Sequence, residues 1–168
     1  QGNSQEPLEV DVQKLSRRSI VLKVRGGNNN VIALDSAEGI VVFDTDVSPA
    51  LAELIRKRIE REFGHDNFTY VINTHGHGDH TNGNSAFPEA QIIGHINVAS
   101  EMEESAKQTP RTIAAIKAGM KRFEAAIEAA KDPEQAESLK AQKDYYEIML
   151  AGLEEGRKPL PPSQTLTE

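Results

Sequence analysis

Cysteine is absent from the 168-residue sequence. Its absence excludes disulfide frameworks, thiolate nucleophiles and sulfur-ligated metal sites, because each of these needs a cysteine sulfur. Any metal ion bound by this chain must therefore be held by nitrogen and oxygen ligands. The cellular compartment stays open, since a protein without cysteine is compatible with either side of a membrane.

An excess of basic residues and long apolar runs are also lacking. The chain has 19 lysine and arginine residues against 26 aspartate and glutamate residues, for a net charge of −7. This balance gives no basic surface for a nucleic-acid backbone, so nucleic acid is not an expected partner. No apolar stretch approaches the roughly 18 residues of a membrane-spanning helix, so a membrane is not expected either. The length suits one domain with an appended helical element.

The chain begins at Gln1 and continues with a polar run through Pro7. Such a start is typical of a mature end left by signal removal, and equally of an expressed segment. The localisation is therefore unknown, with an exported or periplasmic protein as the favoured expectation.

Residues 8–46 have the pattern of a meander of short strands. Leu8, Val10 and Val12 alternate with polar residues, as in a half-buried strand. Further strands, separated by turns rich in glycine, asparagine and serine, are expected at 19–24, 31–34 and 40–43. The uninterrupted apolar run Ile40–Phe43 predicts a strand covered on both faces.

Helices and strands then alternate, which predicts an α/β fold. Ser48 and Pro49 form a cap followed by proline at the first helical position, and Gly64 is a suitable helix stop. Strands are expected on either side of a histidine-rich segment, at 68–72 and 91–93. Asn97 is a candidate cap for the next helix.

The segment 109–157 predicts an antiparallel helical hairpin. Thr109-Pro110 and Asp132-Pro133 both have the form of a helix start. Apolar residues recur at spacings of three and four on the first helix, at Ile113, Ile116, Met120, Phe123 and Ile127. The predicted organisation is thus a domain over 8–108, the hairpin over 109–157 and an extended linker over 158–168.

Three of the five histidines fall within six residues, together with an aspartate, in the order His75-Gly76-His77-Gly78-Asp79-His80. Neutral imidazole offers a lone pair to a metal, and the two glycines let the backbone bend enough to bring several ligands together. His75 and His77 suit one ion, and Asp79 and His80 suit a second. Two ions about 3.5–4 Å apart are typical of hydrolases that use a shared hydroxide as nucleophile.

The segment Thr74–Asn84, THGHGDHTNGN, resembles the signature of the metallo-β-lactamase superfamily, and Val41–Asp46, VVFDTD, resembles the family's strand that ends in an aspartate near the site. The similarity covers about residues 8–100. It implies the N-terminal half of an αβ/βα sandwich, a mixed sheet plus helices, followed here by the α-helical hairpin.

The resemblance also implies roles for individual residues. His75 and His77 would bind the first metal, and Asp79 and His80 the second. Asp79 would also orient or deprotonate the attacking water. Asp44 would support the ligands from behind or serve only as a turn residue, and His95 is a candidate contact to substrate or metal. His65 is interpreted as a solvated residue at a helix end.

The sequence departs from the family pattern because it has no histidine after His95. In the family the second half supplies a third histidine for the first metal, a bridging aspartate and a final histidine. The segment Leu160–Leu166 resembles the one that leads into that half. We favour a fragment of a longer enzyme over two complementing chains or self-association, and the expected partner is the missing C-terminal half or a second copy. The isolated chain is not expected to be a well-behaved monomer.

The function that the resemblance implies is that of a metal-dependent hydrolase. The expected cofactor is zinc, with two ions in the complete protein, although iron and manganese also suit these ligands. The metal-activated water would attack an ester, thioester, lactam or related bond of a small-molecule substrate. This chain alone is expected to be inactive. The alternative is a non-catalytic metal-binding or assembly half, in which the hairpin is a packing or dimer element rather than a substrate-facing insertion.

Overall fold

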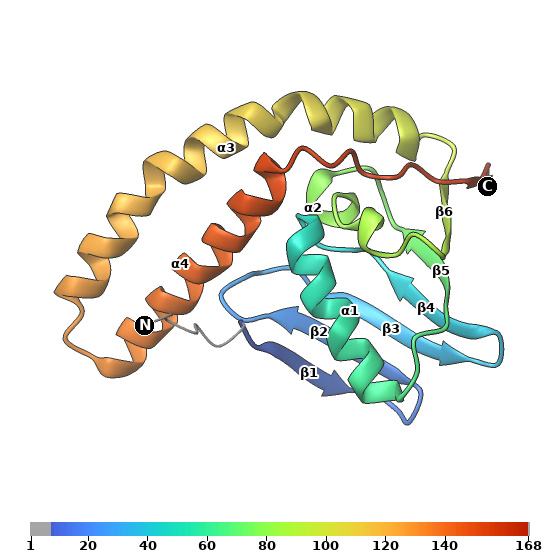
Figure 1. Ribbon diagram of the computed structural model, residues 1–168, viewed down its shortest axis with the longest axis horizontal. Coiled ribbons are helices and arrows are strands. Elements are labelled where there is room, and N and C mark those ends of the chain that lie inside the picture. The colour runs from blue at the N-terminus through green and yellow to red at the C-terminus, as the bar shows by residue number, and fades with distance from the viewer. Residues whose placement is uncertain (1–7, 168) are drawn as a thin grey trace.

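Seven strands form one mixed sheet whose spatial order, β1 to β7, follows the order along the chain (Figure 1). The computed structural model describes residues 8–167, so the polar run through Pro7 lies outside the described residues. The elements are β1 (Val10–Lys14), β2 (Ser19–Val24), β3 (Val31–Ser36), β4 (Gly39–Phe43), α1 (Pro49–Phe63), β5 (Phe68–Asn73), α2 (Gly78–Thr81), η1 (Asn84–Ala86), β6 (Gln91–His95), α3 (Val98–Ala129), α4 (Pro133–Glu154) and β7 (Gln164–Leu166).

The first four strands are an antiparallel meander, as the sequence predicts, and the later pairs are parallel. The turn between β3 and β4 ends at Gly39, whose φ of 126° lies in the region that favours glycine. Because β4, β5 and β6 are parallel, their carboxyl ends meet at one edge of the sheet. The loops that follow these three strands therefore lie side by side, which is where α/β sheets commonly bind ligands.

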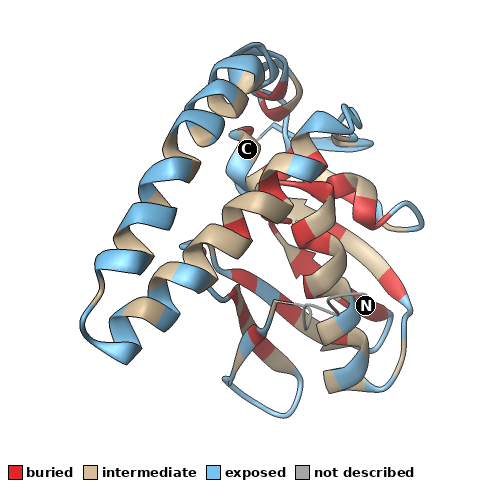
Figure 2. Ribbon diagram, turned by 60° about the vertical axis from the view of Figure 1, so that its left-hand side comes forward, coloured by how far each residue is buried: buried red, intermediate tan, exposed pale blue. Residues whose placement is uncertain are grey.

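The helix α1 covers one face of the sheet (Figures 1 and 2). Its ends are those that the sequence predicts. The Ser48 hydroxyl accepts a hydrogen bond from the Leu51 amide, and Gly64 ends the helix in the left-handed conformation with φ of 78°. The buried side chains that form the core between helix and sheet include Leu51, Ile55, Ile59, Ile20, Leu22, Val24, Val31 and Val42.

The opposite face of the sheet carries a row of apolar side chains that are not fully buried. The register aligns one residue from each of five neighbouring strands, namely Val21, Ile32, Phe43, Ile72 and Ile93. Ile32, near the middle of this row, is 40% exposed, and the others are half-buried. The expectation that Ile40–Phe43 is covered on both faces is therefore wrong: Ile40 and Val42 are buried under α1, whereas Val41 and Phe43 are not.

The first helix of the hairpin begins at Val98 and runs to Ala129 without a break, rather than beginning at Pro110 as the sequence suggested. Proline inside a helix cannot donate to the carbonyl four residues earlier. Here that carbonyl belongs to Ala106, which is exposed, as is Pro110, so the carbonyl without a donor is not buried away from solvent. Asn97 occupies the N-cap position, but its side chain makes no capping hydrogen bond. Figure 2 shows that most of α3 is exposed.

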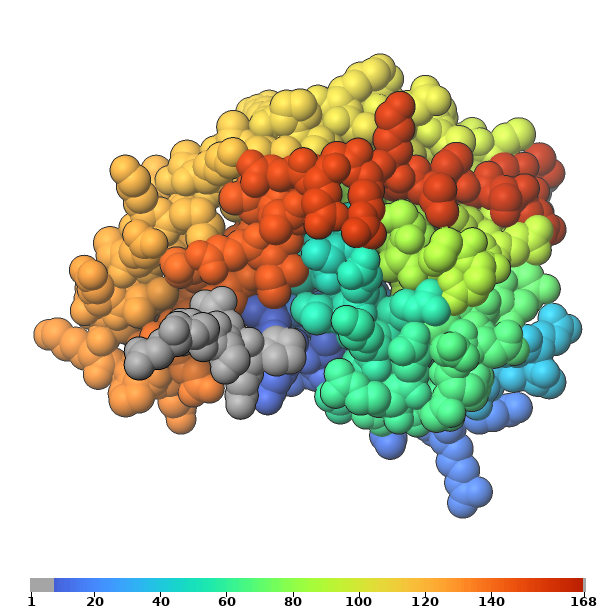
Figure 3. Space-filling view, in the orientation of Figure 1, coloured from blue at the N-terminus to red at the C-terminus, as the bar shows by residue number. Residues whose placement is uncertain are grey.

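The helix α4 starts at the predicted cap, where the Asp132 carboxylate accepts from the Glu134 amide, and packs beside α3 and α1. The chain then crosses the molecule between α3 and α1 (Figure 3). The carbonyl of Leu160 accepts a hydrogen bond from Asn84 on the way. Residues 164–166 of the expected linker form β7, which pairs in parallel with β6. None of the helices in the described part of the chain is sufficiently long and apolar to cross a membrane.

Candidate metal centre

The predicted ligands lie together at the carboxyl end of β5. The strand ends at Asn73, the chain bends at Thr74 and His75, and α2 begins at Gly78. The His75 ring centroid lies 4.7 Å from that of His77 and 4.1 Å from that of His80. His75 and His80 are half-buried, whereas His77 and Asp79 are exposed. The structure thus gathers the three imidazoles at the edge where the loops after the parallel strands meet.

Asp44 lies behind the predicted ligands and contacts one of them, His80, and the residue before another, Thr74. It follows β4, has a φ of 58°, and its side chain is only 10% exposed. Its Oδ1 accepts the Thr74 amide at 2.9 Å, and its Oδ2 accepts the Thr74 hydroxyl and His80 Nδ1, each at 2.8 Å. Such a carboxylate–histidine contact orients an imidazole and selects its tautomer.

These contacts favour the same tautomer on two histidines. Both nitrogens of His80 face a carboxylate, and the shorter contact, 2.8 Å from Nδ1 to Asp44 against 3.4 Å from Nε2 to Asp79, favours the proton on Nδ1 and the lone pair on Nε2. The Thr74 hydroxyl uses its hydrogen on Asp44, so its oxygen accepts from His75 Nδ1 at 3.0 Å. Both rings therefore have Nε2 available as the metal-binding atom. His80 Nε2 lies 3.4 Å from Asp79 Oδ2.

Metal ligation itself stays a prediction. Within residues 8–167, no three histidine, aspartate or glutamate side chains are grouped closely enough to hold a metal ion.

The two outlying histidines lie apart from the cluster. His95 is exposed at the end of β6, where its Nδ1 accepts from the Asn97 amide. His65 follows α1 and lies 3.2 Å from the Asp35 carboxylate.

Helix α3 holds the ligand segment through the two glycines between the ligands. The Gly76 amide donates to Glu101 Oε2 at 2.7 Å, and the Gly78 amide donates to the Ser105 hydroxyl at 2.8 Å. Glu101 and Ser105 are four residues apart and so share one face of the helix. A Cβ atom on Gly76 would lie only 2.3 Å from the Glu101 Cβ, so glycine is required for this approach. Sequence reasoning missed both α3 residues.

We expect Glu101→Ala to weaken zinc binding by about tenfold, the lower end of the range for groups that orient metal ligands. The variant leaves the Gly76 amide without its acceptor, so the segment between His75 and His77 is less well fixed. Glu101→Gln keeps an acceptor oxygen and should recover most of the affinity. Competition with a chelator measures this. The matched control is Glu128→Ala, an exposed glutamate near the other end of α3; an equal loss in that variant would contradict the role of Glu101.

A second set of polar side chains fixes the end of the ligand segment. The Thr45 amide donates to the His80 carbonyl at 2.8 Å. The buried side chains of Asn73 and Asn84 donate to each other at 2.8 and 3.1 Å. Asn84 also reaches the Leu160 carbonyl, so the same residue ties the site to the segment after α4. Nothing in the sequence marks these asparagines as partners, since only the folded chain brings them together.

A pocket of about 260 Å³ opens beside His77 and Asp79. The remaining lining comes from the loop after β4, from α2 and above all from the hairpin, namely Val47, Gly78, Asn82, Ser105, Gln108, Thr109, Thr112, Met149 and Leu153. None of these carries a charge, and they combine apolar side chains with hydroxyl and amide groups. The hairpin therefore contributes directly to the surroundings of two predicted ligands.

A mixed α/β sheet with a histidine-rich segment at the end of a parallel strand defines the class of fold. The sequence matches the family model described as "Metallo-beta-lactamase superfamily" over residues 24–161, and the chain belongs to that superfamily. No curated protein matches the sequence significantly.

Solved structures of metallo-beta-lactamases share the fold at low sequence identity. The enzyme from Erythrobacter litoralis, with beta mercaptoethanol in its active site, matches with a TM-score of 0.51 and 16% identity over 58% of this chain and 46% of that one. FIM-1 from Pseudomonas aeruginosa, in a mono-zinc form, matches with a TM-score of 0.51 and 11% identity over 60% of this chain and 48% of that one. The enzyme from Hirschia baltica matches with a TM-score of 0.48 and 18% identity over 56% of this chain and 48% of that one. The chain thus spans about half the length of these structures.

Proposed function

We propose that this chain forms part of a metal-dependent hydrolase that uses two zinc ions. The main support is the 3.4 Å separation of His80 Nε2 from Asp79 Oδ2. Two donors bound to one tetrahedral zinc at about 2.1 Å lie about 3.4 Å apart, so this pair already has the spacing of two ligands. The donor set, imidazole nitrogen and carboxylate oxygen, is also one that zinc accepts.

The chain's residues would divide the work as follows. His75 and His77 hold one ion, and Asp79 and His80 hold the other. Zinc held by these residues would supply a water with a pKa lowered to about 7 and would polarise the scissile carbonyl. Asp79 would orient or deprotonate the attacking water, for which its exposed carboxylate is accessible. Asp44 keeps the His80 lone pair on Nε2.

The substrate class that the surroundings favour is a small molecule with an uncharged group next to the bond that is cleaved. The pocket beside His77 and Asp79 is lined by the apolar side chains of Val47, Met149 and Leu153 together with hydroxyl and amide side chains. Glu101, Glu103 and Glu104 line the adjoining hollow by His77, which disfavours an anionic group there. Esters, thioesters and lactams with a neutral substituent fit this description.

The reaction is tested with the complete, zinc-loaded protein and a panel of neutral and anionic esters and lactams. We expect hydrolysis that is lost on treatment with a chelator and restored by zinc, with neutral substrates preferred. Zinc binding without turnover of any substrate would instead favour the non-catalytic metal-binding or assembly role. Absence of zinc binding would contradict the hydrolase proposal.

We further propose that the open sheet face packs against the C-terminal half of the enzyme. The row Val21, Ile32, Phe43, Ile72 and Ile93 gives this face an apolar strip across five strands, and such strips are normally covered. The chain's coverage of about half of the matched structures agrees with a missing layer.

Size-exclusion chromatography with light scattering tests this assembly. The isolated chain should self-associate through the open face, and Ile32→Lys should reduce the association because it places a charge in the strip. A clean 18.4 kDa monomer would contradict the proposal. A discrete dimer that binds zinc and hydrolyses substrate would show that a second copy takes the place of the C-terminal half.

A further inference from the structure

The carboxylate of Asp46 is buried next to the ligand segment but is not one of the predicted ligands. Asp46 is 2% exposed and has a φ of 67°. Its Oδ1 accepts from the Val47 amide at 2.6 Å, the Tyr145 hydroxyl at 3.1 Å and Asn29 Nδ2 at 3.4 Å. A buried carboxylate needs such donors to offset the loss of water. Here they come from the loop after β4, from α4 and from the loop between β2 and β3.

The hydroxyl of Tyr145 remains protonated and can therefore always act as a hydrogen-bond donor to Asp46. Tyr145 is 6% exposed, and burial together with the charge of Asp46 raises the pKa of its hydroxyl. Burial likewise raises the pKa of Asp46, whereas the hydrogen bonds from Val47, Tyr145 and Asn29 lower it. The Tyr145 hydroxyl therefore stays protonated around neutral pH and donates a hydrogen bond to Asp46.

Asn29 connects this buried group to a predicted metal ligand. Its Nδ2 donates to the Asp79 backbone carbonyl at 2.7 Å as well as to Asp46 at 3.4 Å. The side chain of Asn29 therefore spans the distance between the buried carboxylate and the backbone at the start of α2. A shift of Asp46 displaces the amide that holds this backbone.

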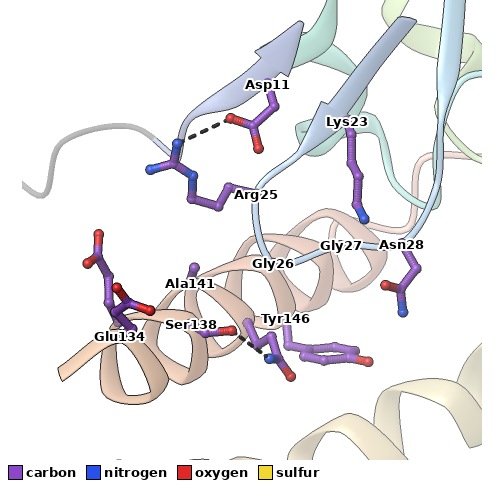
Figure 4. Close-up of a pocket in the computed structure, with 12 residues that line it drawn as sticks. Asp11, Lys23, Arg25, Gly26, Gly27, Asn28, Glu134, Ser138, Ala141 and Tyr146 are labelled. Atoms are coloured by element: carbon purple, nitrogen blue, oxygen red, sulfur yellow. Dashed lines mark hydrogen bonds and ion pairs between the residues drawn. The ribbon is translucent and has the colours of Figure 1, made fainter. Parts of the chain in front are cut away.

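The loop that carries Asn29 is packed directly on α4. A Cβ atom on Gly26 would lie 2.2 Å from the Ala141 carbonyl oxygen, and one on Gly27 would lie 2.4 Å from the Tyr145 ring. Figure 4 shows Gly26 and Gly27 against α4, at the rim of a pocket of about 540 Å³. The position of the loop is thus set by the helix, both through the backbone and through Asp46.

We propose that Tyr145 of the inserted hairpin is a positioning residue, which acts through Asp46 and Asn29 to fix the backbone of the ligand Asp79. This inference rests on the proposed function for the ligand role of Asp79. It gives the hairpin a task in the site beyond packing: removal of the Tyr145 hydroxyl frees Asp46 and Asn29 to move, and the Asp79 carboxylate then takes its metal-binding position less often.

The test compares Tyr145→Phe with Tyr146→Phe, its neighbour on α4. The Tyr146 ring packs on both Phe123 and Tyr145, but its hydroxyl is not among the donors to Asp46, so this variant removes a hydroxyl without touching the proposed chain of contacts. In the complete zinc-loaded enzyme, Tyr145→Phe should weaken zinc binding about tenfold in a chelator competition, whereas Tyr146→Phe should stay within about twofold. In the metal-free protein, the NMR shift of the His80 amide, which shares a peptide bond with Asp79, should move in Tyr145→Phe only. Asn29→Ala should reproduce both effects and also serves if Tyr145→Phe does not fold.

Unchanged zinc affinity and an unchanged His80 amide in Tyr145→Phe, even with reduced thermal stability, would overturn the proposal and leave Tyr145 as a packing residue. Equal effects in both tyrosine variants would overturn it as well. The proposed function fails separately, if the wild-type enzyme binds zinc but hydrolyses nothing. The amide comparison needs neither zinc nor substrate and therefore decides the positioning role in every case.

Discussion

Replacement of His77 by alanine is expected to lower the hydrolytic rate of the complete zinc-loaded enzyme by about 1,000-fold or more. This exceeds the 10–100-fold loss that follows removal of a group behind the ligands, because a ligand itself is lost. His77 is exposed, and the hydrogen bonds that it makes to α2 use its backbone carbonyl, which alanine retains. The free energy of unfolding should therefore change by no more than about 0.5 kcal/mol.

The matched control for this variant is His65→Ala. His65 is also partly exposed and lies at the end of a helix, where it contacts Asp35 rather than the cluster. Turnover should be unchanged in His65→Ala, as measured by initial rates on the best neutral substrate. If His77→Ala retains its turnover, the hydrolase proposal is wrong whatever the metal content.

The elements that the sequence predicts well are those whose ends are set by local chemistry. Ser48 with Pro49 and the left-handed Gly64 define α1, because a capping hydroxyl, a proline without an amide hydrogen and a glycine with positive φ act within a few residues. The strands of the meander follow from alternation of apolar and polar residues, which is also local.

The errors arise where distant contacts or solvent decide. Pro110 looks like a helix start, but the helix continues through it because the freed carbonyl is exposed to water. The segment after Gly156 is rich in proline and polar residues and is expected to be extended. Within it Gln164–Leu166 pairs with β6, whose edge is a distant partner that the local sequence does not name.

In the candidate site, too, the features set by nearby residues could be predicted from the sequence, and those set by distant contacts could not. The cluster from His75 to His80 is apparent from spacing, and the structure brings its three rings together. The groups that hold it are distant in sequence: Glu101 lies 25 residues from Gly76, and Tyr145 lies 99 residues from Asp46. Their residue types are common on helices, so only the fold identifies them as partners of the ligand segment.

Asp44 is the one supporting residue that the sequence did suggest, although a turn role was equally open. Its contacts separate the two roles. Asparagine tolerates the left-handed backbone at this position, so Asp44→Asn preserves the turn. It also preserves an acceptor for the Thr74 amide, but it places an amide NH₂ where Oδ2 now accepts from His80 Nδ1. Two donors then face each other, and relief comes if the His80 proton moves to Nε2, the atom needed by the metal.

We therefore expect Asp44→Asn to bind zinc 10- to 100-fold more weakly, about the effect of losing a carboxylate that orients a histidine ligand, with little change in thermal stability. Chelator competition measures the affinity, and the nitrogen NMR shifts of His80 report the tautomer in the metal-free protein. Asp66→Asn is the control, since Asp66 is exposed and the charge change is the same. If Asp44→Asn binds zinc with wild-type affinity, Asp44 serves only the turn. The His80 proton would then remain on Nδ1, and Nε2 would remain available to the metal, without the carboxylate.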